Sequence, residues 1–160
     1  MSEKAFPEPG FTAPDFSLPD HSGEQFTLSA NRGRPVVVFF YPMDGTMVCT
    51  AQNKCVLDAY ADFEGYNAVV VAISGGSIES RSRFVARYGF RHTMLVDEGR
   101  KVARRWGAVK LGIIPQRVTF VIAPDGRVFR SYSAMLQSSE HIRFALDALK
   151  ELQGTSAPFG

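Results

Sequence analysis

Two uninterrupted apolar stretches divide the sequence and predict buried strands. Residues 35–41 read Pro-Val-Val-Val-Phe-Phe-Tyr, and residues 68–74 read Ala-Val-Val-Val-Ala-Ile-Ser. Apolar runs without polar alternation are typical of strands whose two faces are both covered. Residues 93–96 and 117–122 are shorter runs of the same kind. We expect these segments to form one central sheet with helices packed against it.

Helical spacing of apolar residues separates the strands. One helix is predicted between Ser77, a suitable N-cap, and Gly89, a suitable C-terminal stop. Its apolar face is predicted to hold Ile78, Phe84, Val85 and Tyr88. Further helical patterns run from the Cys49 region to about residue 65, over residues 100–106, and from Ser138 or Ser139 to Gly154.

Two hairpins complete the predicted fold. Residues 15–28 alternate polar and apolar around a Pro-Asp-His-Ser-Gly turn, and residues 117–130 surround an Ala-Pro-Asp-Gly turn. Alternating strands and helices followed by a late hairpin indicate an α/β fold. We expect a mixed central β-sheet, helices on both faces and an N-terminal β-hairpin. Residues 1–160 are interpreted as one domain, with residues 1–10 and 155–160 flexible.

Composition excludes several functional classes. The chain has 18 Lys and Arg against 16 Asp and Glu, a net charge of +2, which does not favour nucleic-acid binding or a membrane surface. No signal pattern and no membrane-length apolar run occurs. Two cysteines do not make a secreted disulfide framework, so we expect a cytoplasmic protein. The dispersed arginines are interpreted as solvated helix faces: Arg81, Arg83, Arg87, Arg91, Arg104 and Arg105.

Metal and cofactor sites are not indicated. His21, His92 and His141 are scattered, share no metal-binding spacing, and are expected on the surface. No Cys-x-x-Cys pair, phosphate-binding loop or Gly-x-Ser-x-Gly elbow is present. We therefore expect no metal and no cofactor.

The candidate chemistry lies in residues 41–52, where a buried strand meets a helix. If Thr46 caps that helix, Cys49 occupies its third position. Backbone amides in the first turn have no intrahelical acceptor, and the positive end of the helix dipole faces the sulfur. Both effects favour a thiolate, the nucleophilic form of cysteine. A structural cysteine in the core would satisfy the same pattern.

The motif Pro42-x-x-x-Thr46-x-x-Cys49 resembles the active-site signature of peroxiredoxins. Gln52 is carried by many members of that family three residues after the cysteine. The flanking residues resemble the bacterioferritin-comigratory, or PrxQ, branch, and similarity extends over about residues 10–150. The resemblance implies a thioredoxin-like fold.

Carried over to this chain, the resemblance implies that Cys49 is the peroxidatic cysteine. Thr46 would hydrogen-bond the peroxide, Pro42 would shield the sulfur, and Arg117 would stabilise the thiolate and the leaving oxygen. Each has a plainer interpretation. Thr46 would be a helix cap, Pro42 a strand terminator, Arg117 a surface arginine and Gln52 a solvated helix residue rather than a supporting one.

Cys55 departs from the family pattern. PrxQ-type proteins with an intrahelical resolving cysteine carry it five residues after the first, where this chain has Lys54. Six residues rise about 9 Å in a helix, beyond the ~7 Å Cα limit for a disulfide. Three interpretations stay open. Cys55 resolves the sulfenic acid after local unwinding, it is a bystander while an external thiol does so, or it forms an intermolecular bridge.

These observations predict an enzyme, a thiol-dependent peroxidase for hydrogen peroxide and organic hydroperoxides. The resemblance implies thioredoxin or glutaredoxin as electron donor and a monomer or weak dimer. The alternative is a peroxide sensor that is oxidised once and passes its oxidation to a partner protein. Steady peroxide consumption with a thiol reductant would distinguish the enzyme from the sensor.

Overall fold

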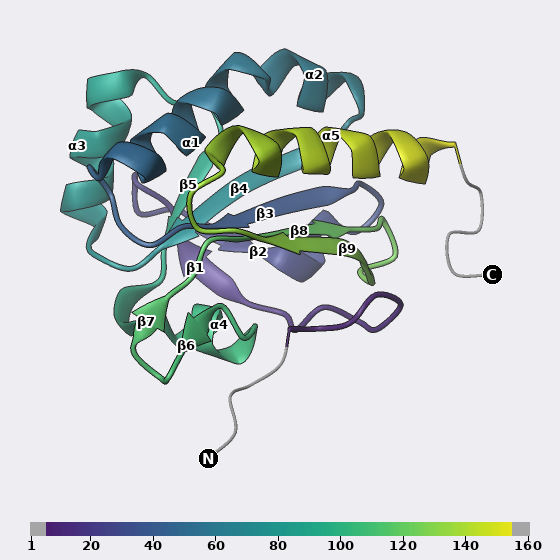
Figure 1. Ribbon diagram of the computed structural model, residues 1–160, viewed down its shortest axis with the longest axis horizontal. Helices are drawn as coiled ribbons and strands as arrows, with labels where there is room; N and C mark the ends of the chain where they lie inside the picture. Colours follow the sequence, from purple (N-terminus) through teal and green to yellow (C-terminus); the bar gives the residue numbers. More distant parts are fainter. Residues whose placement is uncertain (1–5, 155–160) are drawn as a thin grey trace.

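A five-stranded mixed sheet forms the centre of the molecule in the computed structural model, which describes residues 6–154 (Figure 1). The strand order is β5-β4-β3-β8-β9. β3 pairs with β4 in parallel, as β4 does with β5, whereas β3–β8 and β8–β9 are antiparallel. The strands are β3 (Val36–Phe40), β4 (Val69–Ser74), β5 (Thr93–Val96), β8 (Val118–Ile122) and β9 (Val128–Ser133).

Two hydrophobic cores lie on the two faces of this sheet, because successive side chains of a strand point to opposite faces. Val37 and Phe39 of β3 join one core, and Val36, Val38 and Phe40 join the other. All five residues of β3 are buried. The uninterrupted apolar runs of the sequence are thus explained by a sheet covered on both sides.

Most of the helical structure covers one face of the sheet (Figure 1). Its core takes side chains from α1 (Met47–Asp58), α2 (Tyr60–Gly65), α3 (Ile78–Tyr88) and α5 (Ser138–Gln153). The opposite core packs against α4 (Lys101–Arg105) and the hairpin of β1 (Ser17–Pro19) and β2 (Gln25–Thr27). The predicted α/β class, mixed sheet, helices on both faces and N-terminal hairpin are confirmed.

Short elements connect these layers. Two 3-10 turns, η1 (Leu28–Asn31) and η2 (Glu98–Arg100), precede β3 and α4. A small antiparallel pair, β6 (Val109–Lys110) and β7 (Ile114–Pro115), was not predicted from the sequence. Its strands are two residues long, too short for a clear alternating pattern.

The helix predictions hold with two corrections. The pattern from Cys49 to residue 65 is two helices, because the chain leaves helical geometry at Ala59. In α3, Ser77 accepts a hydrogen bond from the Ser80 amide and Gly89 ends the helix in left-handed geometry, as predicted. Ile78, however, is exposed, and the buried face of α3 includes Arg81.

The first described residues contact the sheet, although residues 1–10 were expected to be flexible. Phe6 packs edge-on against Phe120, and the Gly10 amide donates to the Val128 carbonyl over 2.8 Å. The rest of that prediction, for residues 1–5 and 155–160, lies outside the described residues. Within residues 6–154, no helix has the length and apolar character needed to cross a membrane.

The register of the sheet brings two distant segments together. Phe40, the last residue of β3, is paired with Val118, the first residue of β8. The chain that continues from β3 into α1 therefore starts beside the chain that enters β8. Cys49 lies in the first of these segments and Arg117 in the second.

Candidate active site

Cys49 lies in the first turn of α1, as the sequence predicted. Thr46 is the N-cap, and its hydroxyl oxygen accepts a hydrogen bond from the Cys49 amide over 3.4 Å. The Thr46 hydroxyl donates in turn to the Met43 carbonyl. Cys49 is only 1% exposed. The sulfur is therefore sheltered from bulk water, while the helix start supplies unpaired amides and a favourable dipole.

Arg117 reaches the sulfur from the position directly before β8. Its Nη2 lies 3.2 Å from Cys49 Sγ, within hydrogen-bond distance. The residue is 2% exposed, so the interpretation of Arg117 as a surface arginine is wrong. A guanidinium beside a buried sulfur attracts negative charge that forms on that sulfur, because the attraction is weakly screened there.

Gln52 fixes Arg117 from the side of the helix. The Gln52 side-chain oxygen Oε1 accepts a hydrogen bond from Arg117 Nη1. Gln52 is buried, so the solvated interpretation is wrong. Its Nε2 is buried without a hydrogen-bond partner among the described residues. Because Arg117 requires an acceptor, Oε1 must face it, and Nε2 is left as the unpaired donor.

Met135 fixes Arg117 from the opposite side and was missed by the sequence analysis. The Met135 carbonyl accepts from Arg117 Nε over 2.8 Å, and its Sδ lies 3.3 Å from the Arg117 amide nitrogen. Met135 belongs to the segment between β9 and α5. The guanidinium is thus held between α1 and this segment, with Nη2 directed at Cys49. Because this contact uses a backbone carbonyl, no residue type or motif in the sequence could indicate it.

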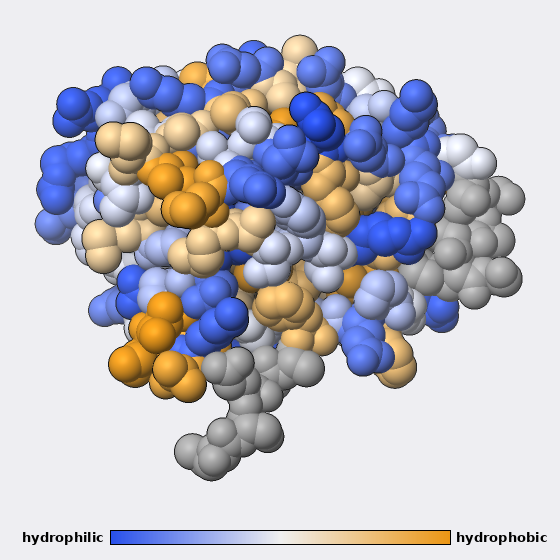
Figure 2. Space-filling view, viewed as in Figure 1, coloured by the Kyte–Doolittle hydropathy of each residue, from blue (hydrophilic) through white to orange (hydrophobic). Residues whose placement is uncertain are grey.

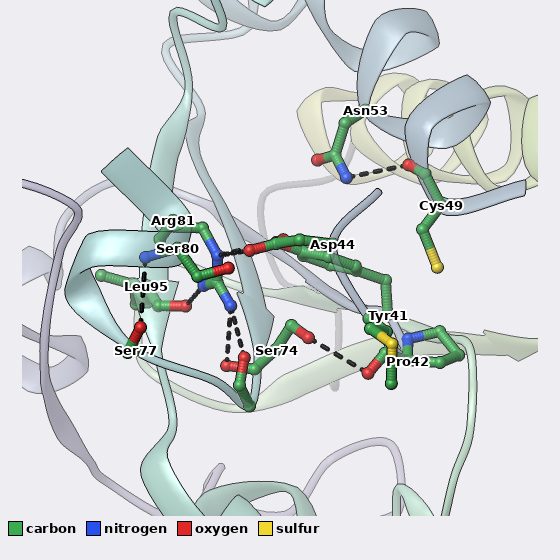
Figure 3. Close-up of polar contacts among 12 residues, drawn as sticks. Tyr41, Pro42, Asp44, Cys49, Asn53, Ser74, Ser77, Ser80, Arg81 and Leu95 are labelled. Atoms are coloured by element: carbon green, nitrogen blue, oxygen red, sulfur yellow. Dashed lines mark hydrogen bonds and ion pairs between the residues drawn. The ribbon is translucent and has the colours of Figure 1, made fainter. Parts of the chain in front are cut away.

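Pro42 lies two residues after the end of β3, in the loop that leads to Thr46. In Figure 3 the Cys49 side chain points from α1 toward this loop. The Pro42 carbonyl accepts from Ser74 Oγ over 3.2 Å and from Arg100 Nη2 over 3.4 Å. The structure therefore brings Pro42, Thr46, Gln52 and Arg117 into the surroundings of Cys49.

Asn53 and His92 hold the first turn of α1 through the Cys49 carbonyl. Asn53 Nδ2 donates to the Cys49 carbonyl over 3.0 Å (Figure 3). Asn53 Oδ1 lies 2.9 Å from His92 Nε2. Since Oδ1 only accepts, Nε2 carries the imidazole proton. The spacing of four residues from Cys49 allows this side chain to reach that carbonyl, but the sequence did not indicate His92.

The expected surface location of the histidines is wrong for two of them. His92 is 1% exposed, and burial lowers its pKa from 6.5 to about 3. His141 is also buried, and burial lowers its pKa too. His141 lies 2.7 Å from both Thr119 Oγ1 and the Ala134 carbonyl. Both histidines anchor segments that lead to the site, whereas His21 is half-buried.

Arg81 corrects the interpretation of the arginines as solvated. Its side chain is completely buried and pairs with Asp44, Nε lying 2.8 Å from Oδ2. The other guanidinium nitrogens donate to the carbonyls of Leu95, Ser74 and Gly75 (Figure 3). Asp44 lies in the same loop as Pro42 and Thr46. This ion pair therefore connects α3 to the loop that begins α1.

Cys55 lies in the same unbroken helix as Cys49. It is half-buried at the edge of the core and is a free thiol. Burial, and then the Asp58 carboxylate, raise the pKa of the Cys55 thiol. Six residues of intact helix separate the two Cα atoms by about 9 Å, so a disulfide requires α1 to unwind.

The arrangement is suited to nucleophilic chemistry at sulfur. A buried cysteine at a helix start meets an arginine whose guanidinium is fixed by hydrogen bonds to Met135 and Gln52. Such a site can attack an electrophilic atom and stabilise the negative charge that leaves it. Within residues 6–154, no three His, Cys, Asp or Glu side chains are grouped as ligands for a metal ion.

Comparison with known proteins identifies the family. The model of the AhpC/TSA family matches residues 9–131. The chain belongs to this family. Chloroplastic peroxiredoxin Q of Sedum lineare is 40% identical over 146 residues, 90% of this chain and 78% of that protein. The corresponding protein of Oryza sativa subsp. japonica is also 40% identical, over 89% of this chain and 67% of its own length.

Solved structures agree with this assignment. Peroxidoxin BcpB from Mycobacterium tuberculosis superposes with a TM-score of 0.85 and 32% identity, covering 91% of this chain and 98% of that one. Xanthomonas campestris peroxiredoxin Q gives a TM-score of 0.80 and 27% identity, covering 85% and 90%. The predicted PrxQ branch and thioredoxin-like fold are therefore confirmed. Membership of this peroxiredoxin branch supports a thiol peroxidase activity.

Proposed function

We propose that the chain reduces hydrogen peroxide and organic hydroperoxides, with Cys49 as the attacking thiolate. One observation carries the proposal: Arg117 Nη2 lies 3.2 Å from Cys49 Sγ inside a buried site. The arginine stabilises the sulfur anion before the reaction and the oxygen anion during it. A structural cysteine would need no buried cation at this distance.

The reaction is a displacement at oxygen. The Cys49 thiolate attacks the terminal oxygen of ROOH, the O–O bond breaks, and RO⁻ leaves and takes up a proton as ROH. The sulfur becomes a sulfenic acid. Arg117 and the free Gln52 Nε2 donate to the two peroxide oxygens, and the hydroxyl of Thr46, an exposed residue, turns toward them. Pro42 has no N–H that could compete for the sulfur.

Organic hydroperoxides fit the entrance to the site. Met43 and Met47 belong to the loop and first turn before Cys49, and Met135 and Leu136 belong to the segment that holds Arg117. All four are exposed. Figure 2 shows apolar side chains gathered on this face near the start of α5. Exposed apolar side chains beside a buried polar centre would contact the carbon chain of ROOH while its –OOH end reaches Cys49.

Return to the thiol requires a reductant. While α1 is wound, the sulfenic acid faces Arg117 and Cys55 is out of reach, so we assign this step to an external thiol, of thioredoxin or glutaredoxin type. Cys55 forms a disulfide with Cys49 only in molecules whose first helical turns have unwound. The raised pKa of the Cys55 thiol also disfavours its attack on sulfur at neutral pH.

Peroxide turnover tests the proposal. Wild type, Cys49→Ser and Cys55→Ser are each supplied with excess peroxide and either thioredoxin or glutaredoxin with its recycling system. We expect turnover in wild type, none in Cys49→Ser and substantial turnover in Cys55→Ser. Full activity in Cys49→Ser would overturn the assignment. A single stoichiometric oxidation of wild type, without turnover, would instead favour the peroxide sensor.

A further inference from the structure

The carboxylate of Asp44 is held by two buried partners from separate elements. The Tyr41 hydroxyl, at the end of β3, donates to Asp44 Oδ1 over 2.6 Å. Arg81 Nε, from α3, lies 3.1 Å from Oδ1 and 2.8 Å from Oδ2. Burial raises the pKa of Tyr41 well above its ordinary value, so the hydroxyl stays protonated and can donate.

Arg81 is itself fixed on all sides. Its remaining nitrogens donate to the carbonyls that end β5 and β4, those of Leu95, Ser74 and Gly75. A completely buried guanidinium that loses its carboxylate partner keeps an uncompensated charge in the core. The Arg81–Asp44 pair therefore resists separation far more than a surface ion pair would.

Beyond the hydrogen bonds that the Pro42 carbonyl accepts from Ser74 and Arg100, the loop that Asp44 anchors has little packing support. Met43, Gly45 and Thr46 around it are exposed, so apolar packing does not fix this part of the chain. Gly45 has a φ of +81°, the left-handed region that favours glycine, so the loop turns at this point. Two residues after Asp44, Thr46 caps the Cys49 amide. The position of Asp44 thus determines where α1 begins.

We propose that Arg81 is a positioning residue for the peroxidatic centre: through Asp44 it keeps the start of α1 wound and thereby keeps Cys49 beside Arg117 and away from Cys55. The inference rests on the proposed function of Cys49 and adds that Arg81 influences which product the Cys49 sulfenic acid forms. It also explains why a fully buried arginine is placed on a helix whose other arginines are exposed.

The two arrangements of α1 lead to different products of the sulfenic acid. In the wound arrangement, Cys49–SOH reacts with an external thiol, or with a second ROOH to give Cys49–SO₂H and ROH. In the unwound arrangement, Cys49–SOH and the Cys55 thiol form a disulfide and release water. Weakening the Arg81–Asp44 pair is therefore expected to raise the yield of disulfide and lower that of sulfinic acid.

The experiment compares Asp44→Asn, Arg81→Met and Tyr41→Phe with wild type. Each reduced protein receives one equivalent of hydrogen peroxide without external thiol, and peptide mass analysis measures the Cys49–Cys55 disulfide. Asp44→Asn leaves the buried Arg81 guanidinium without its carboxylate, so we expect the disulfide to form about a hundredfold faster. Tyr41→Phe, which loses one hydrogen bond to a charged group but keeps the ion pair, should show a smaller increase of about tenfold.

Two controls separate positioning from general stability. Arg83→Met removes an exposed arginine of the same helix and should behave as wild type. Leu152→Ala removes core packing at the far end of α5 without touching the loop. If Leu152→Ala raises the disulfide yield as much as Asp44→Asn does, the positioning role is wrong. Should Arg81→Met fail to fold, Asp44→Asn and Tyr41→Phe carry the test.

A second oxidant distinguishes failure of this inference from failure of the proposed function. Diamide converts two thiols to a disulfide without peroxide chemistry, so its rate with Cys49 and Cys55 reports whether α1 opens and lets them meet, independently of peroxide activation. Faster diamide disulfide formation in Asp44→Asn supports the positioning role even if wild type reduces no peroxide. Unchanged rates in folded Asp44→Asn and Tyr41→Phe, with either oxidant, overturn it.

Discussion

His92 makes the stability of the protein depend on pH in a calculable way. Its imidazole is 1% exposed, and its pKa is lowered from 6.5 to about 3 by burial. Nε2 faces Asn53 Oδ1, and Nδ1 is buried without a partner among the described residues. A second proton would therefore occupy a nitrogen that is buried from solvent and has no acceptor among residues 6–154.

The sign follows from the two pKa values. Between about pH 6.5 and pH 3 the unfolded chain binds a proton at His92 and the folded chain does not, so acid favours unfolding. Stability is complete above the unfolded pKa and falls as the pH decreases through this window. One pH unit corresponds to about 1.4 kcal/mol, so His92 alone should lower the free energy of unfolding by about 2 kcal/mol between pH 7.5 and pH 5.

The perturbation that tests this is His92→Gln, which retains an amide donor for Asn53 but cannot titrate. Urea unfolding at 25 °C, with a reductant present, gives the free energy of unfolding of wild type and variant at both pH values. His141 and the carboxylates titrate in both proteins and cancel in the comparison. We expect the loss on acidification to be about 2 kcal/mol smaller in His92→Gln. Equal losses in the two proteins would refute the argument.

Three further predictions concern the site. Arg117→Met should lower the second-order rate constant for hydrogen peroxide by about a hundredfold or more, as loss of a preorganised donor does. Arg117→Lys should recover only part of that rate constant. Stopped-flow kinetics measures both variants, and a rate constant near that of wild type in Arg117→Met would contradict the role of Arg117. Gln52→Leu should lower the same rate constant by about tenfold because Arg117 loses its acceptor, whereas Gln52→Glu should retain the contact. Thr46→Val should destabilise the protein by about 1 kcal/mol and slow peroxide reduction, with Thr46→Ser as the matched control, which should retain both properties.

The sheet and the positions around Cys49 could be predicted because their signals are local. Continuous apolar runs mark β3 and β4, and the spacing from Thr46 to Cys49 marks a capped first turn. Arg117 required the resemblance to peroxiredoxins, since nothing in its own neighbourhood in sequence indicates a thiol 68 residues away. Its burial was then found in the structure.

The supporting contacts could not be predicted, because they join residues whose partners are set by tertiary packing. Arg81 and Asp44 are 37 residues apart, and His92 and Asn53 are 39 apart. Arg81 is indistinguishable in sequence from the exposed arginines around it, and His92 from a surface histidine. These polar residues become core residues only because α3 and the segment before β5 pack against the start of α1.

The pairing of Phe40 with Val118 gives the thiol a further property. Cys49 follows β3, which pairs in parallel with β4, and Arg117 precedes β8, which pairs antiparallel with β3. A chain in which β3, β4 and β5 had assembled without β8 would present the cysteine at its helix start with no guanidinium beside it. A slip of two residues between β3 and β8 would displace Arg117 by about 7 Å, beyond contact with the sulfur. Peroxide reduction therefore reports that the two halves of the sheet have joined in register. If the chain were cut between β5 and β8, recovery of peroxide reduction would measure how much of the fragment mixture had reassembled correctly.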